Sequence, residues 1–168
     1  MSSQSYDLPD PFYYNIGQIA AKWSAIEAEL EFIILDAYEI NQNNGLILSS
    51  QLGYRAKIEL IRVLLNWKAD HEARKSKEMF DLVAKVDEAY GRRNATVHSV
   101  WRGSAEPNIA SRTSIRAKGK LKYGSEPVTI EELEADVEAL RTLGRALRTA
   151  HDAKRFSTKD SNEDAPEK

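Results

Sequence analysis

FYYNIGQIAAKWSAIEAELEFIILDAYEIN, the segment from Phe12 to Asn41, decides the fold class of this 168-residue chain. Apolar residues recur in it at steps of three or four, the period of a helix that buries one face. They are Ile16, Ile19, Trp23, Ile26, Leu30, Ile33, Ala37 and Ile40. Asn43-Asn44-Gly45 follows and predicts a stop, because Asn and Gly tolerate the left-handed backbone of a helix C-cap. The stripe is broad enough that part of it can form a dimer interface rather than a core.

Three further segments carry helical patterns. The first is expected to start at Ser49 or Ser50, as an N-cap, with an apolar stripe of Leu52, Ala56, Leu60, Val63, Leu64 and Trp67. The second runs from Lys75 to Tyr90, and Gly91 ends or bends it. Its apolar side consists of Met79, Leu82, Val83, Val86 and Tyr90. The last follows Thr129-Ile130-Glu131-Glu132, a capping box, and its stripe is Leu133, Val137, Leu140, Leu143 and Leu147. These patterns and their short connections predict a mainly α fold, an up-and-down bundle of four to five helices.

A different pattern separates the last helix from the others. Turn signals at Gly103-Ser104 and Pro107-Asn108 precede alternating residues from Ile109 to Arg116, and Leu121-Lys122-Tyr123 follows Gly119. We therefore expect a small β-hairpin insert before the last helix. The chain divides into a polar N-terminal segment (1–11), a helical domain (12–156) and a disordered tail (157–168), which has no large apolar residue.

The composition excludes several kinds of site. The chain has no cysteine, which rules out disulfides, thiolate zinc sites and a cysteine nucleophile. Its three histidines do not pair at metal-ligand spacing, and no glycine-rich phosphate loop or nucleophile elbow is present. We expect neither a metal nor a cofactor. No apolar run reaches the about 18 residues of a membrane span, and residues 1–11 do not resemble a signal peptide, so we expect no membrane contact and a cytoplasmic protein.

Charge is distributed unevenly along the chain. Residues 1–48 contain seven acidic residues and one basic residue, whereas residues 91–123 contain eight basic residues and one acidic residue. A basic block in a nearly neutral protein can bind a polyanion. The same block can equally be a solvated hairpin, or can pair with the acidic first helix of its own chain or of a partner subunit.

The candidate chemistry lies in Arg93-Asn94-Ala95-Thr96-Val97-His98. Metal-free RNA cleavage needs a base for the 2′-hydroxyl proton, an acid for the leaving oxygen and a cation for the phosphate. Histidine can act as base or acid near neutral pH, and arginine matches phosphate oxygens. Arg93 and His98 would lie about 140° apart on an ideal helix. One site would therefore need an irregular backbone after Gly91 or a group from a second subunit.

This segment resembles the motif of HEPN ribonucleases, in which an arginine, usually followed by a polar residue, precedes a histidine by four to six intervening residues. Here Asn94 follows Arg93, and four residues separate Arg93 from His98. The resemblance implies a HEPN-like bundle over about residues 12–153, active on RNA. It also implies a homodimer with facing motifs, products ending in 2′,3′-cyclic phosphate, and a toxin–antitoxin or phage-defence context with a possible cognate antitoxin protein.

Two functions stay open at this stage. In the first, an endoribonuclease, His98 is base or acid, Arg93 clamps the phosphate and Asn94 orients the site. Its RNA-binding residues would be Arg92, Arg102, Arg112, Arg116, Lys118 and Trp101. The second is a non-catalytic HEPN-like interaction, antitoxin or nucleotide-sensing module. Structural roles remain open for the same residues: His98 can be a buried histidine with Arg93 paired to Asp87 or Glu88, and Trp101 can pack the hairpin onto the bundle.

Overall fold

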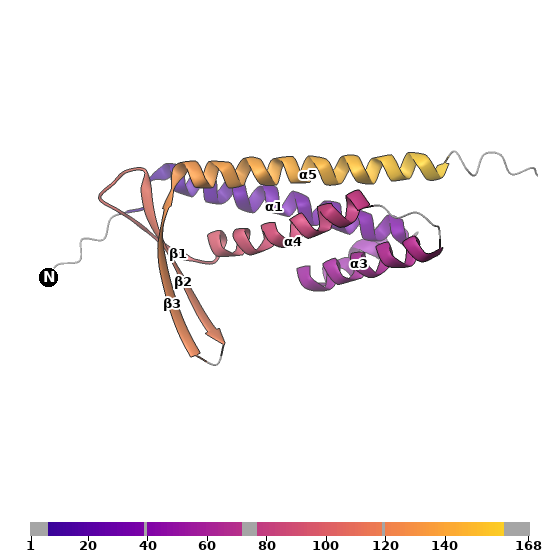
Figure 1. Ribbon diagram of the computed structural model, residues 1–168, viewed down its shortest axis with the longest axis horizontal. Coiled ribbons are helices and arrows are strands. Elements are labelled where there is room, and N and C mark those ends of the chain that lie inside the picture. Colours follow the sequence, from indigo (N-terminus) through magenta and orange to yellow (C-terminus); the bar gives the residue numbers. More distant parts are fainter. Residues whose placement is uncertain (1–6, 39, 72–76, 119, 160–168) are drawn as a thin grey trace, which may run out of the picture. The chain divides into compact units, whose positions relative to one another are not determined.

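The computed structural model describes residues 7–38, 40–71, 77–118 and 120–159, without the side chains of 42, 71, 116–118, 120–122 and 154–159. Within these residues the chain is mainly helical, with one small antiparallel sheet (Figure 1). The helices are α1 (Asp10–Ala37), α2 (Gln42–Ser50), α3 (Tyr54–His71), α4 (Lys77–Val97) and α5 (Ile130–Lys159). The strands are β1 (Val100–Gly103), β2 (Ile109–Lys118) and β3 (Lys120–Thr129).

The chain forms two compact units. Unit 1 comprises residues 1–24 and 88–141, and unit 2 comprises residues 25–87 and 142–168. Unit 1 therefore contains the start of α1, the end of α4, the sheet and the start of α5. Unit 2 contains the remaining parts of these helices together with α2 and α3. In the described residues, no helix has both the length and the apolar character required to cross a membrane.

Three of the predicted apolar stripes form the core of the units to which they belong. Ile19 and Trp23 of α1 are buried in unit 1, and Ile26 and Leu30 are buried in unit 2. In the stripes of α4 and α5, Tyr90 is half-buried. The other predicted members are confirmed as buried: Met79, Leu82, Val83, Val86, Leu133, Val137, Leu140, Leu143 and Leu147. The capping box is also confirmed: the backbone N–H of Glu132 donates to Thr129 Oγ1 at 3.2 Å, and that of Thr129 donates to Glu132 Oε2 at 2.8 Å.

The region after the first helix differs from the prediction. Asn43-Asn44-Gly45 does not end a helix; it lies inside the additional helix α2, whose N-cap Asn41 accepts a hydrogen bond from the Asn43 backbone N–H at 3.0 Å. Ser49 and Ser50 lie in the last turn of α2, and α3 begins only at Tyr54. The stripe predicted for α3 was also wrong, since Trp67 is 52% exposed and Val63 is exposed as well. The buried face instead contains Tyr54, Lys57, Ile58, Ile61, Leu64 and Leu65.

The sheet is more extensive than the predicted hairpin. β2 pairs with β3 as expected, and β1 adds a third strand to give the order β1-β2-β3. The register places Trp101 opposite Arg112 and Ile115 opposite Tyr123. In unit 2, α5 continues to Lys159, which is within the segment expected to be a disordered tail. Residues 160–168 of that expected tail lie outside the described part of the chain.

Candidate functional site

Arg93, Asn94 and His98 come together at the end of α4 in unit 1. Gly91 does not interrupt this helix, which continues through Val97. His98 follows it directly, and its backbone N–H donates to the carbonyl oxygen of Asn94 at 3.1 Å. Arg93 Nη1 donates to Asn94 Oδ1 at 2.9 Å and lies 3.0 Å from His98 Nε2. On an ideal helix these two residues would lie about 140° apart. The long Arg93 side chain nevertheless reaches His98 of the same chain.

The chemistry of the two partners limits how they can bond. A guanidinium group has only donors, so a hydrogen bond from Arg93 Nη1 to His98 requires Nε2 to accept. Arg93 Nε is buried and has no hydrogen-bond partner among the described residues, whereas His98 is exposed. An accessible histidine beside a cation is suited to proton transfer next to a phosphate.

Buried Thr96 holds the middle of the motif against the sheet. Its carbonyl oxygen accepts from Trp101 Nε1 at 2.7 Å, and its Oγ1 accepts from Arg112 Nη1 at 3.3 Å. The Arg112 guanidinium lies over the Trp101 ring, 5.9 Å from its centroid, and bonds Glu126 Oε1 through Nη2 at 2.6 Å. Trp101 also packs against Phe12, with 6.3 Å between ring centroids. Trp101 and Arg112, two residues proposed to bind RNA, thus have structural contacts that position the motif.

The remaining predicted RNA-binding residues differ in their surroundings. Arg92 forms ion pairs with Glu88 at 2.8 Å and with Asp136 at 3.4 Å. Arg102 is exposed and forms no ion pair with any side chain that the structure describes. The side chains of Arg116 and Lys118 lie outside the described part. Arg93 does not form the ion pair with Glu88 that was considered as a structural role; Arg92 forms it instead.

Asp136 gives the neighbourhood of Arg92 a pH dependence. Its pKa lies above the ordinary value of 3.8, because burial disfavours the carboxylate more than Arg92 and Arg112 favour it. Between pH 3.8 and the raised pKa, the Asp136 carboxyl keeps its proton in the folded chain but loses it in the unfolded chain. The free energy of unfolding therefore falls as the pH rises through this range. Asp136→Asn has no carboxyl proton to lose, so it should abolish this fall in stability. Urea denaturation at several pH values should show the variant gaining stability relative to wild type across this window; a difference independent of pH would contradict the assignment.

Three acidic residues of α1 have partners within unit 2. In unit 2, Glu29 pairs with Arg148, Glu31 Oε1 accepts from Lys57 Nζ at 2.5 Å, and Asp36 Oδ2 lies 2.7 Å from His151 Nε2. His151 is therefore a buried residue with a carboxylate partner. Only the spacing of apolar residues around it on α5 could have indicated this burial. Among the described residues, no three histidine, aspartate or glutamate side chains are grouped so that they could hold a metal ion.

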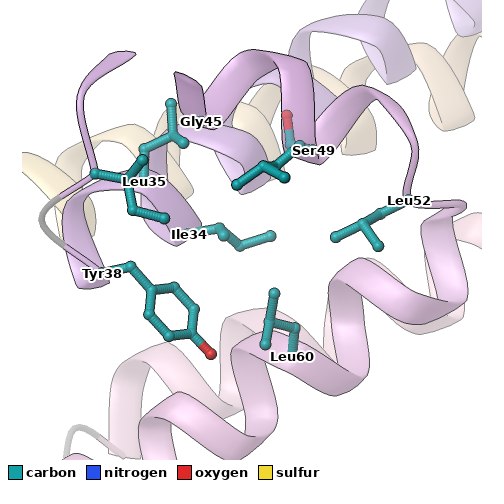
Figure 2. A pocket seen from close by; sticks show the side chains of 9 residues that line it. Ile34, Leu35, Tyr38, Gly45, Ser49, Leu52 and Leu60 are labelled. Atoms are coloured by element: carbon teal, nitrogen blue, oxygen red, sulfur yellow. The ribbon is translucent and has the colours of Figure 1, made fainter. Parts of the chain in front are cut away.

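Unit 2 contains an apolar pocket of about 170 Å³ (Figure 2). Ile34, Leu52 and Leu60 surround its space, and Tyr38 and Ser49 lie at its wall. The Ser49 hydroxyl donates to the carbonyl oxygen of Leu46 at 3.3 Å, so it is already bonded within α2. With no acid, histidine or cationic residue in its lining, this pocket is not suited to acid–base chemistry.

No protein-family model matches the chain, and no curated protein or solved structure matches it either.

Proposed function

We propose that the chain is a metal-independent endoribonuclease with a HEPN-like, up-and-down helical bundle, acting on cytoplasmic RNA as a toxin or phage-defence component. The observation that supports this most strongly is the contact of Arg93 with both Asn94 and His98. This contact brings together a donor for phosphate, an amide and an imidazole, although the three residues do not share a helical face.

The proposed reaction begins with neutral His98. Its Nε2 takes the proton of a 2′-hydroxyl once Arg93 turns from the histidine to the phosphate. The 2′ oxygen then bonds to phosphorus, and the bond from phosphorus to the 5′ oxygen breaks. The 5′ oxygen receives a proton, so the products carry a 2′,3′-cyclic phosphate and a 5′-hydroxyl. In a homodimer, a second His98 in its protonated form would supply that proton, and the proton taken from the 2′-hydroxyl passes to solvent before the next turnover.

A cleavage assay in EDTA tests this function. Wild type should cut total RNA without divalent metal, and Arg93→Ala should cut it about 10²–10³-fold more slowly, because a charge-stabilising donor at the phosphate is lost. Arg141→Ala is the matched control, since Arg141 pairs only at the surface with Glu138 in the described contacts. Equal rates for the two variants would contradict the role of Arg93, and loss of wild-type cleavage in EDTA would contradict the mechanism.

A second function is supported by the paired arginines. Arg92 bonds two carboxylates and Arg112 bonds Glu126, so neither presents a free cation to a polyanion. This pattern fits the non-catalytic alternative, an interaction, antitoxin or nucleotide-sensing module with a protein partner. That alternative predicts no RNA cleavage by folded protein and a stoichiometric partner in a pull-down from the native cell.

A further inference from the structure

The three-stranded sheet of unit 1 has two chemically different faces. Side chains alternate between the faces along each strand, so the register assigns every residue to one of them. One face carries Trp101, Ala110, Arg112 and Val128, which are buried or bonded to neighbouring elements. The opposite face, here called the outer face, includes Val100, Arg102, Ser111, Thr113, Ile115, Tyr123, Ser125 and Pro127.

Large side chains are exposed on the outer face. Tyr123 is 69% exposed and lies directly opposite Ile115, which is 57% exposed, and Val100 is exposed on β1. No hydrogen bond or ring contact of Tyr123 occurs within the described residues. An accessible aromatic ring on a flat sheet can receive a nucleobase, because every base presents a π-face.

The polar groups of the outer face favour a nucleic acid over an acidic or apolar partner. Ser125 Oγ lies 2.8 Å from Ser111 Oγ and 3.2 Å from Thr113 Oγ1, which gathers three hydroxyls beside Tyr123. Arg102 provides a guanidinium without a described carboxylate partner. The outer face contains no acidic residue, and Arg102 is its cation among the described side chains; the register assigns Arg116, Lys118, Lys120 and Lys122 to the opposite face. A cation with no acidic neighbour on the same face favours the phosphate of a nucleic acid over an acidic partner.

We propose that the outer face binds single-stranded RNA. A base stacks on Tyr123 beside Ile115, Arg102 contacts the phosphate, and the hydroxyls of Ser111, Thr113 and Ser125 bond base edges or 2′-hydroxyls. The strand must be single, because a base inside a duplex cannot leave its neighbours to stack on Tyr123 at no cost. The choice of RNA over DNA rests on the proposed ribonuclease function; the rest follows from the composition of the face.

Binding can be measured separately from cleavage. The probe is a fluorescent oligouridine of about 12 nucleotides, within the range that such surfaces cover, added to the full chain carrying His98→Gln in EDTA. Tyr123→Ala in that background should weaken binding by roughly 5- to 150-fold, the loss of one base–aromatic stack. Arg102→Ala should reduce the slope of log affinity against log salt by about 0.7, the loss of one phosphate contact. Tyr14→Ala, which removes another exposed tyrosine of unit 1, should leave both quantities unchanged.

Each outcome decides the proposal. Selective loss for Tyr123→Ala, with weaker binding of the same oligouridine in a duplex, supports it. Equal affinities for Tyr123→Ala and Tyr14→Ala, equal binding of duplex and single strand, or no binding at all overturn it. Cleavage by wild-type protein is scored independently: cutting without any effect of Tyr123→Ala on affinity refutes the outer face alone, and binding without cutting refutes the catalytic function alone.

Discussion

Replacing His98 by alanine is expected to slow RNA cleavage by about 10²–10⁴-fold, the usual contribution of one acid–base group. The loss should appear in kcat, because His98 is proposed to act on a proton and not to hold the RNA. His98→Ala also removes the acceptor that Arg93 Nη1 contacts at 3.0 Å, so a second variant is needed to separate proton transfer from positioning.

His98→Gln provides that separation. A glutamine oxygen can accept from Arg93, but an amide does not take up a proton near neutral pH. Both variants should therefore be almost inactive while keeping the helical circular dichroism and the thermal midpoint of wild type. Wild-type activity in His98→Gln would show that the side chain only holds Arg93, and it would contradict the acid–base role.

The largest loss of stability is expected from Glu31→Ala in unit 2. Glu31 Oε1 bonds Lys57 Nζ at 2.5 Å, and the Lys57 side chain is only 9% exposed. Removing the carboxylate leaves a buried ammonium without a partner among the described residues. This arrangement typically costs about 3–5 kcal/mol, and we expect the lower end because the Glu31 side chain is 23% exposed. Urea denaturation should show a lower midpoint with an unchanged slope.

Two control variants distinguish the buried charge from a general effect. Glu138→Ala breaks a surface pair with Arg141 and should cost less than about 1 kcal/mol. Glu31→Leu combined with Lys57→Met removes both charges and should restore most of the lost stability, since apolar replacement of a buried pair is often neutral or better. A midpoint for Glu31→Ala no lower than that for Glu138→Ala would contradict this account.

The same ion pair explains why the buried face of α3 was not predicted. Lys57 lies on that face, and a lysine normally indicates the exposed side of a helix. The predicted stripe with Val63 and Trp67 contains only apolar residues, whereas the face that is buried includes Lys57. The partner that makes Lys57 tolerable is Glu31, on another helix, and no spacing rule connects the two. By contrast, α4 and α5 have no charged residue in their predicted stripes, and those stripes are buried as expected.

Two glycines show the limits of local signals. Gly91 suggested a helix end, but α4 continues, because an interior glycine costs only about 1 kcal/mol and buried Ala89 and Thr96 hold the helix on either side. Gly45 suggested a C-cap, yet it lies where a Cβ atom would come within 1.8 Å of Leu35 Cδ2. Its role is the close approach of α2 to α1, which depends on tertiary packing.

The sequence named the residues of the candidate site but did not predict how they contact one another. The motif identified Arg93, Asn94 and His98, while helix geometry alone placed Arg93 and His98 about 140° apart. The long Arg93 side chain makes the contact, since its Nη1 lies 3.0 Å from His98 Nε2, and Thr96 between the two residues bonds Trp101 and Arg112. Those bonds require the register of the sheet, which the sequence pattern does not specify.

The end groups of RNA cut in EDTA test the central claim most directly. Wild-type protein is incubated with an end-labelled single-stranded RNA, and the products are analysed for their 3′ and 5′ groups beside a His98→Gln control. The account predicts fragments with 2′,3′-cyclic phosphate and 5′-hydroxyl ends, formed without metal and absent from the control. Intact RNA, fragments with 3′-hydroxyl and 5′-phosphate ends, or equal cutting by His98→Gln would contradict it.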